Sequence, residues 1–327
     1  MTAREVHDWL GSLPVRDGWT WISTPRAFAH DEGGYDAQYA NDPANLAVGR
    51  GMVRLLRRRG ASFDRPGVEI GCGTGLLSLG LAAESPYPLT LLTDPSPAFL
   101  RITRDKVARR GVEPSRVAYG VLMGEEIDRL PAGAFSLVAL RSTLHHILDV
   151  DRFVRDAARA LAPGGVLTFQ EPCLEGYVLM GALVQFLAPL AAASGRALSP
   201  AQAAKVDEFT RSMSFYARRD VDKRQAEDKH LFRVDELMRS SRAAGMDMEF
   251  LPNVEYNQFD SPADAAAPSP VSFTAFFRSY ARYCMSWDEA LMARFDELLV
   301  PYCRVVEESS GGGSGPYLHG VFVATKR

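Results

Sequence analysis

The stretch VEIGCGTGL, residues 68–76, decides the fold of this chain. It reads as a short apolar strand with an acid, Glu69, near its end, followed by a turn with glycine at positions 71, 73 and 75. Glycine lets the backbone turn sharply and approach a ligand where a Cβ would collide. The apolar residues that follow predict a helix over 76–83, whose first N–H groups are free to meet a ligand. The stretch therefore predicts a binding loop for something small and polar.

Outward from this loop, short apolar runs alternate with amphipathic helices. We expect strands at 89–94, 116–122, 135–140 and 166–170, and helices at 97–110 and 151–161. Ser96 and Pro97 suit the start of the first helix, because serine accepts a first-turn N–H and proline fits the first helical position. Such alternation predicts a parallel sheet with helices on both faces.

The spacing of the glycines separates the loop from two better-known phosphate loops. A dinucleotide fingerprint, G-x-G-x-x-G, would need a glycine where Leu76 stands, and a P-loop would need a Gly-Lys-Ser/Thr ending. The remaining pattern, acidic-x-Gly-x-Gly-x-Gly, resembles the first motif of the class I methyltransferases that depend on S-adenosylmethionine (SAM). This cofactor is a sulfonium amino acid joined to a nucleoside, without phosphate, so an acid such as Glu69 suits it.

Other phrases of the sequence are similar to the same family. They are Leu144-His145-His146 after the fourth strand, ALAPGGVL at 160–167, and the segment from Asp235 to Met246 that leads into a sixth strand. The resemblance covers residues 44–172, 232–259 and 317–327. It implies an α/β fold, a Rossmann-like doubly wound sheet of seven strands whose last strand, 318–325, is antiparallel, with mainly helical lid insertions.

The resemblance also implies the domain organisation. We expect an N-terminal cap at 1–43, a SAM-binding core at 44–172, a helical lid insertion at 173–231, more core at 232–259, a second helical insertion at 260–316, and a final core strand at 317–327. In open α/β sheets ligands bind beyond the carboxyl ends of the strands, so the first insertion is well placed to build the substrate pocket.

Asp94 ends the second strand, about twenty residues after the loop, where a carboxylate can accept both ribose hydroxyls. The family commonly has an aspartate for the adenine amino group where Met123 stands here. The Gly124 backbone or Glu125 could replace it, or the alignment with the family could be shifted by two residues. Arg141 could meet the cofactor's carboxylate or face solvent, and Tyr35 and Tyr39 could close over the cofactor or pack beneath the cap. The implied cofactor-binding residues are Glu69, Gly71, Cys72, Gly73, Gly75, Asp94, Pro95, Met123, Gly124, Glu125, Arg141, Tyr35 and Tyr39.

Methyl transfer needs an aligned nucleophile, exclusion of water, and a base where the acceptor carries a proton. The catalytic candidates are His145, His146 and Glu171, with His230 and His319 as weaker ones. The histidines could be a general base or could only shape the pocket. Glu171 could contact substrate or cap a neighbouring helix. We expect no metal, because the four cysteines are widely spaced and the acidic pair of catechol-type enzymes is missing after the fourth strand.

An uncharged run at 176–195 meets the length criterion for a membrane span. Gln185 and Pro189 interrupt it, and it directly follows the fifth strand, so we expect a buried helix over the active site rather than a span. Membrane contact and a subunit interface remain alternatives. An apolar lid indicates a partly apolar substrate.

The composition excludes some function classes. With 46% hydrophobic residues, 24% charged residues and a net charge of −3, the 327-residue chain is an ordinary globular protein, and a long nucleic-acid footprint is not expected. The first residues lack the pattern of a signal peptide, so we expect a cytoplasmic protein. A homodimer is an open alternative to a monomer. The predicted function is methyl transfer from SAM to O, N or C of a small metabolite. A nicotinamide-dependent oxidoreductase and a SAM-binding protein without turnover are the alternatives.

Overall fold

Nine strands form one sheet in the order β1-β2-β5-β4-β3-β6-β7-β9-β8. The computed structural model describes residues 1–26, 32–39, 41–84, 86–261, 268–310 and 315–327, without the side chains of Glu32 and Tyr39. The strands are β1 (Val15–Arg16), β2 (Trp19–Trp21), β3 (Gly67–Ile70), β4 (Thr90–Asp94), β5 (Val117–Val121), β6 (Phe135–Arg141), β7 (Leu161–Pro172), β8 (Met246–Pro252) and β9 (His319–Lys326). From β2 to β7 neighbouring strands are parallel, whereas β9 runs antiparallel between β7 and β8. The predicted Rossmann-like sheet with an antiparallel last strand is therefore confirmed.

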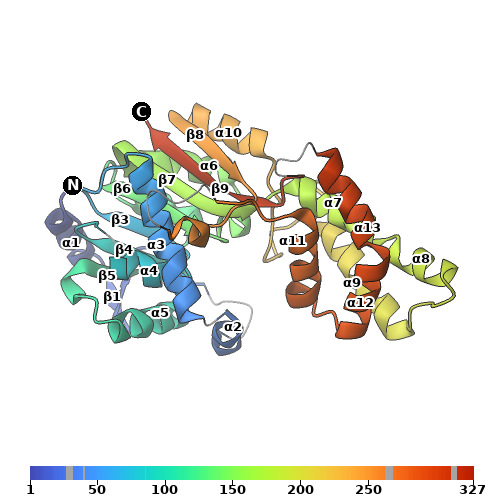
Figure 1. Ribbon diagram of the computed structural model, residues 1–327. Helices are drawn as coiled ribbons and strands as arrows, with labels where there is room; N and C mark the ends of the chain where they lie inside the picture. Colours follow the sequence, from blue (N-terminus) through green and yellow to red (C-terminus); the bar gives the residue numbers. More distant parts are fainter. Residues whose placement is uncertain (27–31, 40, 85, 262–267, 311–314) are drawn as a thin grey trace.

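Helices cover both faces of the sheet, as Figure 1 shows. On one face lie α1 (Ala3–Gly11), α6 (Val150–Ala160) and α10 (Val234–Ala243); on the other lie α3 (Asp42–Arg58), α4 (Ser78–Glu84) and α5 (Pro97–Arg109). Every residue of β3 and β4 is buried, as expected for central strands with helices on both faces. The Ser96 hydroxyl accepts the Phe99 N–H at the start of α5, so the predicted cap is confirmed.

The sheet has two strands more than the seven predicted, both from the N-terminal region. The β1–β2 hairpin adds to the edge of the sheet, where Thr20 pairs with Gly120. Its turn is Asp17-Gly18, and both residues have positive φ, 51° and 79°. This is the backbone of a type I′ hairpin turn, which Asp-Gly favours. The correction has a physical reason: strands this short carry almost no periodic signal.

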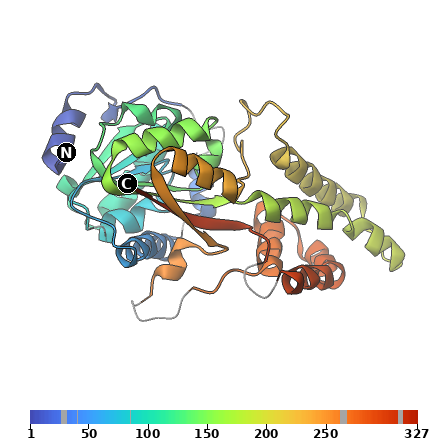
Figure 2. The same ribbon diagram turned by 90° about the horizontal axis from the view of Figure 1, so that it is seen from above.

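The two insertions form one helical body beside the sheet (Figures 1 and 2). The first supplies α7 (Leu174–Val184), α8 (Leu187–Ala193) and α9 (Pro200–Ala217); the second supplies α11 (Phe273–Ser279), a π-helical turn (Tyr280–Cys284), α12 (Glu289–Leu298) and α13 (Val300–Ser309). Their shared core includes Phe209, whose ring centroid lies 5.5 Å from that of Phe277 and 5.6 Å from that of Trp287. Apolar burial of this kind holds together segments that are far apart in sequence.

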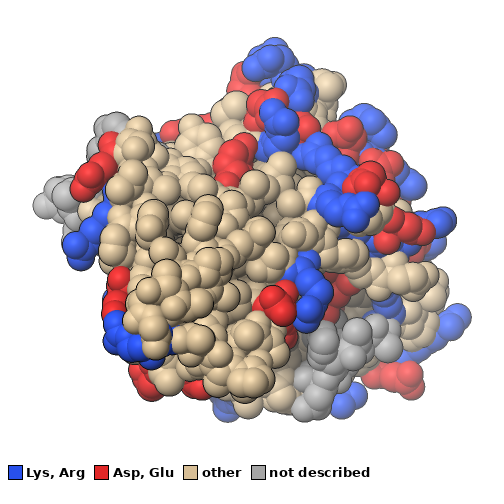
Figure 3. All heavy atoms as spheres, turned by 90° about the vertical axis from the view of Figure 1, so that its right-hand side faces the viewer, with Lys and Arg blue, Asp and Glu red and all other residues tan. Residues whose placement is uncertain are grey.

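The apolar run at 176–195 becomes the two consecutive helices α7 and α8. By length and composition, Leu174–Ala193 is the one candidate membrane span among the described residues, with a mean hydropathy of 1.7, and 39% of it is buried. Figure 3 shows the end of the molecule that the helical body forms, where charged side chains lie mainly around a wide uncharged area. The exposed large hydrophobic side chains of this body are Val178, Phe186, Phe215, Tyr283, Tyr302 and Val305.

Candidate active site

A cavity of about 890 Å³ lies at the carboxyl ends of the central strands. The chain order reverses here, since β4 follows β3 on one side and β6 flanks it on the other, and such switch points are where open α/β sheets bind ligands. The walls come from the glycine turn, the ends of β3, β4 and β6, the helix α2 (Glu32–Tyr39), and residues 225–229 of the first insertion. Neither α7 nor α8 lines the cavity, so the predicted place of the apolar run over the active site is wrong.

The glycine turn is left-handed at all three glycines, with φ of 72° at Gly71, 50° at Gly73 and 94° at Gly75. A Cβ on Gly71 would lie 2.4 Å from Cγ2 of Thr143, so this position requires glycine. A Cβ on Gly73 would meet no protein atom within 4 Å, because that side opens into the cavity. The first two glycines and Cys72 line the cavity, whereas Gly75 does not.

Two buried acids stand on the cavity wall beside this turn. Glu69 is 1% exposed, accepts the Ser78 hydroxyl at 2.7 Å, and has its pKa raised to about 8 by burial. Asp94 accepts the backbone N–H groups of Gly73 at 2.9 Å and Ser96 at 2.8 Å. Burial raises the pKa of Asp94 to about 6 in spite of these two donors. Both carboxylates are therefore held in place and poised to gain from a cationic or hydroxyl-bearing ligand.

Arg141 brings a cation to the same wall. It ends β6 and lines the cavity, and its buried Nε has no hydrogen-bond partner among the described residues. A buried guanidinium donor without a partner is costly, and a carboxylate is the group that matches it best. The alternative of a solvent-facing side chain is therefore wrong.

A second polar group lines the cavity where the 3₁₀ turn η3 (Leu144–His146) follows β6. Glu171, at the end of β7, is 1% exposed and accepts the backbone N–H groups of Thr143 at 2.8 Å and Leu144 at 2.6 Å. Its other oxygen lies 2.5 Å from Nδ1 of His145. Glu171 does not line the cavity. Of the two roles left open, the structure shows the cap, and the carboxylate also orients His145.

The first insertion completes this group with Asp228. Its Oδ1 lies 3.4 Å from Nε2 of His145 and 3.4 Å from Nδ1 of His146. Nδ1 of His146 also lies 3.0 Å from the Glu227 carbonyl oxygen, and the two imidazole centroids are 4.1 Å apart. Asp228 is a site residue that sequence reasoning missed, because no local motif marks a residue brought in by the path of an insertion.

The two histidines differ in charge. Burial lowers the pKa of His145, but the charges of Glu171 and Asp228 outweigh it and raise the pKa to about 10. The pKa of His146 is lowered by burial and by the neighbouring His145. At neutral pH His145 is therefore a cation and His146 is neutral. Opposite shifts in adjacent groups are the usual sign of divided acid and base roles.

The structure brings most of the predicted site residues together. Those that line the cavity are Tyr35, Glu69, Gly71, Cys72, Gly73, Asp94, Pro95, Met123, Gly124, Glu125, Arg141, His145 and His146. The side chain of Tyr39 lies outside the described part of the chain. His230 lines a different hollow, and His319 is buried with its ring 5.0 Å from that of Phe276. Besides Asp228, lining residues that the sequence did not indicate include Arg26, Gln38, Phe99, Thr143, Gln225 and Lys229.

His145, His146 and Asp228 offer donor atoms that lie within 4.8 Å of one another, close enough to share a cation. Each of them already interacts with a neighbouring protein group. The absence of a metal stays a prediction.

Comparison with known proteins identifies the class of the core. Residues 68–167 match the family model described as a methyltransferase domain, and they form a class I SAM-dependent methyltransferase domain. The match covers the strands from β3 into β7, and with them the glycine turn, both acids, Arg141 and the histidine pair. SAM is the cofactor of this domain class.

Among curated proteins the chain is similar to ubiquinone biosynthesis O-methyltransferases. It is 35% identical to that of Methylobacterium nodulans over 130 residues, which are 39% of this chain and 47% of the relative. It is 30% identical to that of Sodalis glossinidius over 115 residues, 35% of this chain and 44% of the relative. A match to the reducing polyketide synthase Preu2 of Preussia isomera, 30% identical over 120 residues, covers 36% of this chain and 5% of that protein. The chain thus spans less than half the length of these relatives.

A solved structure from Galdieria sulphuraria, named as a candidate sarcosine dimethylglycine methyltransferase, has the same fold over almost the whole chain. Its TM-score is 0.51 at 9% identity, and the match covers 99% of this chain and 97% of that one. A candidate methyltransferase solved with the Haloferax volcanii Trm112 methyltransferase activator gives a TM-score of 0.50 at 12% identity, with 91% and 99% covered. At these identities the likeness concerns the fold alone.

Proposed function

We propose that this protein transfers the methyl group of SAM to a hydroxyl oxygen of a small, partly apolar molecule. One observation carries the proposal. A single cavity is lined both by the glycine turn with Glu69, Asp94 and Arg141, which we call the first wall, and by the His145–His146–Asp228 group, which we call the second wall. The first wall matches the cofactor of the domain class, and the second can handle the proton of an acceptor.

The residues of the first wall fit SAM group by group. Asp94, fixed by two backbone N–H groups, has remaining lone pairs for the ribose hydroxyls. Glu69, whose pKa burial raises to about 8, would lose its proton beside the positive amino group, and the unpartnered Nε of Arg141 suits the carboxylate. The open side of Gly73 leaves room for the ligand next to the backbone. When bound, SAM supplies an electrophilic methyl group that needs no further activation.

On the second wall the two histidines have different roles toward the acceptor. The Glu227 carbonyl can only accept a hydrogen bond, so Nδ1 of His146 carries the hydrogen in this arrangement and Nε2 keeps its lone pair. Neutral His146 is accordingly the proposed base for the hydroxyl proton. His145, held as a cation by Glu171, stabilises the oxyanion that forms. Glu171 acts through His145 and is a positioning residue.

Two observations support an oxygen acceptor. Two of the three relatives quoted above are named ubiquinone biosynthesis O-methyltransferases. A hydroxyl, unlike a neutral amine, becomes a good nucleophile only when its proton leaves, and the histidine group provides for that step.

Incubation with methyl-labelled SAM and matched phenols, catechols and aryl amines tests the proposal. We expect label on hydroxyl oxygen, and a fall in kcat of about 100-fold in His146→Asn, within the range typical of a lost general base. His7→Asn is the control, because His7 is exposed on α1 and does not line the cavity. Transfer only to amines, or an unchanged kcat in His146→Asn, would contradict the proposed acceptor chemistry.

A further inference from the structure

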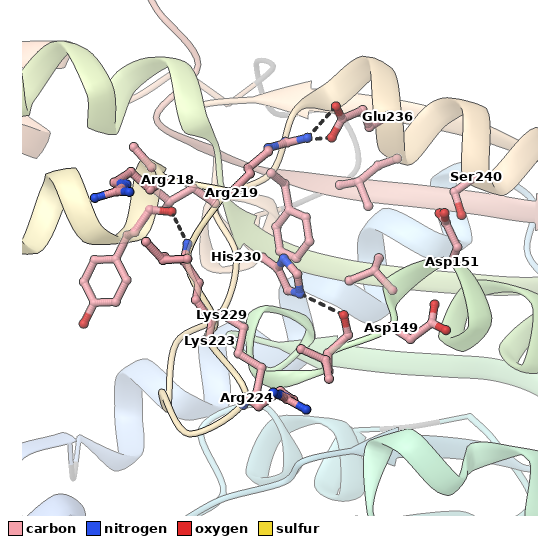
Figure 4. Close-up of a pocket in the computed structure, with 18 of the residues that line it drawn as sticks. Asp149, Asp151, Arg218, Arg219, Lys223, Arg224, Lys229, His230, Glu236 and Ser240 are labelled. Carbon is pink, nitrogen blue, oxygen red and sulfur yellow. Dashed lines mark hydrogen bonds and ion pairs between the residues drawn. The ribbon is translucent and has the colours of Figure 1, made fainter.

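A second hollow, of about 1060 Å³, lies outside the cofactor cavity (Figure 4). Its walls are the start of α6 with the residues before it, the end of α9, the segment 218–232 and the outer side of α10. We call this hollow the basic groove. It shares Lys229 with the cofactor cavity and otherwise has its own lining.

The lining of the basic groove is positively charged in a protein whose net charge is −3. Seven Lys and Arg residues line it, against four Asp and Glu residues. Four of these cations are paired, Arg219 with Glu236, Arg224 with Asp222, and Arg218 and Arg239 with Asp220 and Asp235 just outside the lining. Among the described residues, the lining cations without an ion pair are Arg155, Lys223 and Lys229. Beneath the charges lies an apolar floor that includes Leu231, Phe232 and Leu237, all under 9% exposed. The groove is therefore amphipathic, with an excess of cations.

Two lysines of the groove are buried without a counter-ion. Lys223 is 8% exposed and Lys229 is 4% exposed. Their ammonium groups donate to backbone carbonyl oxygens, Lys223 to Tyr216 at 2.7 Å and Lys229 to Ala226 at 2.9 Å. Among the described residues, neither forms an ion pair with a carboxylate, although Lys106 and Lys205 do. Burial lowers the pKa of both groove lysines.

Charged side chains are rarely buried without an opposite charge, because the loss of hydration is not offset. Backbone carbonyls offset part of this loss, and the carboxylates of Glu125, Glu227 and Asp228 act on Lys229 without forming an ion pair with it. A bound anion would supply the missing charge, and an apolar chain attached to it would cover Leu148, which lines the groove and is 45% exposed.

We propose that the basic groove binds an amphipathic anion, a phosphate or carboxylate head group on an apolar chain, with Lys223 and Lys229 as its counter-ions. The site is separate from the cofactor cavity, and its existence does not rest on the proposed function.

The segment between the two hollows gives this ligand a route to the active site. Gln225, Glu227 and Asp228 line the cofactor cavity, whereas Lys223 and Arg224 line the groove. The Lys229 N–H also donates to the His145 carbonyl oxygen at 2.8 Å. An anion that holds Lys223 and Lys229 would order this segment and so favour cofactor binding.

Isothermal titration with monooctyl phosphate and with octanoate, both below their micelle concentrations, tests the site. We expect one-to-one binding of at least one of the two, with much weaker binding of inorganic phosphate and of octyltrimethylammonium. Lys223→Met with Lys229→Met should weaken binding at least tenfold. Lys205→Met is the matched control, because Lys205 is exposed on α9 and pairs with Glu208.

If the double variant does not fold, the single variant Lys223→Met serves for the same test. Lys223 lines the groove and not the cofactor cavity, so this variant leaves the cofactor site untouched. Equal affinities for the wild type and Lys223→Met, or equally tight binding of the cationic amphiphile, would overturn the proposal. The link to the active site is measured as the affinity for S-adenosylhomocysteine (SAH) with and without octyl phosphate. A gain of severalfold supports the link, and an unchanged affinity overturns it while leaving the binding site intact.

Discussion

Replacement of Arg141 by methionine separates a cofactor-binding role of this residue from a structural one. Methionine keeps an unbranched apolar stem and removes the guanidinium. In the ligand-free protein the Nε of Arg141 is buried without a hydrogen-bond partner among the described residues, so its removal forfeits no such bond. The free energy of unfolding should therefore change little. Binding of SAH should change strongly, because the carboxylate of SAH would lose its cation.

The magnitude follows from the type of contact. Hydrogen bonds to charged groups contribute about 1.5–3 kcal/mol each. One such bond lost corresponds to roughly a 10- to 100-fold weaker SAH affinity, since 1.4 kcal/mol is a factor of ten. The loss of SAH affinity should be increased through Glu69. Arg141 lowers the pKa of the buried Glu69 carboxyl, so Arg141→Met would favour the neutral form of this group.

Titration calorimetry with two ligands isolates the effect. SAH carries the amino acid carboxylate, whereas 5′-methylthioadenosine has the nucleoside and the sulfur without it. We expect Arg141→Met to weaken SAH and leave methylthioadenosine within about twofold of the wild type. Arg101→Met, an exposed position on α5 outside the cavity lining, should change neither. An equal loss for both ligands would show a general distortion and refute the carboxylate contact.

Four further predictions rest on named contacts. Burial raises the pKa of Asp94 to about 6, so only about a tenth of this carboxyl is ionised at pH 5. SAH should therefore bind about tenfold more weakly at pH 5 than at pH 7. Asp94→Asn should flatten this pH dependence. The same shift predicts that the contribution of Asp94 to the stability of the ligand-free fold falls as pH rises from about 4 to 6, because the folded state holds this proton more tightly than the unfolded chain. Gly71→Ala places a Cβ 2.4 Å from Thr143 Cγ2 at a φ of 72°, and in a denaturant titration it should lower the free energy of unfolding by about 2–3 kcal/mol. The control Gly60→Ala, at a φ of 71° with open space around it, should lower the free energy of unfolding by about 1 kcal/mol. Glu171→Gln keeps an acceptor for the Thr143 and Leu144 N–H groups but removes the charge beside His145. NMR titration should then find the His145 pKa well below 10, while the SAH affinity stays within about twofold of the wild type. An unshifted His145 pKa would show that Glu171 does not hold this proton.

The core of the fold could be predicted from the sequence because its signals are local. The glycine turn, the acids at strand ends and the Ser96-Pro97 cap each fit within a few consecutive residues, and the structure places them as expected. The β1–β2 hairpin had a local signal too, Asp17-Gly18, but two- and three-residue strands gave it no periodic support. Local chemistry thus predicts the central strands better than the edge.

The acceptor side of the site could not be predicted in the same way. Asp228 reaches the histidines through the path of the segment after α9, and no spacing rule connects position 228 with positions 145 and 146. The apolar run at 176–195 was placed over the active site because hydrophobicity alone does not say which partner covers it. Its partners are α9, which follows in the same insertion, and helices of the second insertion about a hundred positions later, which together bury one side of it in a separate helical core.

Titration calorimetry of the wild-type protein with SAH and with NAD⁺ tests the central claim most directly. We predict that SAH binds with a stoichiometry of one per chain, that Asp94→Ala weakens this binding at least tenfold, and that NAD⁺ gives no measurable heat of binding. Binding of NAD⁺ without SAH, or SAH affinity that is indifferent to Asp94→Ala, would contradict the assignment of the cavity as a SAM site.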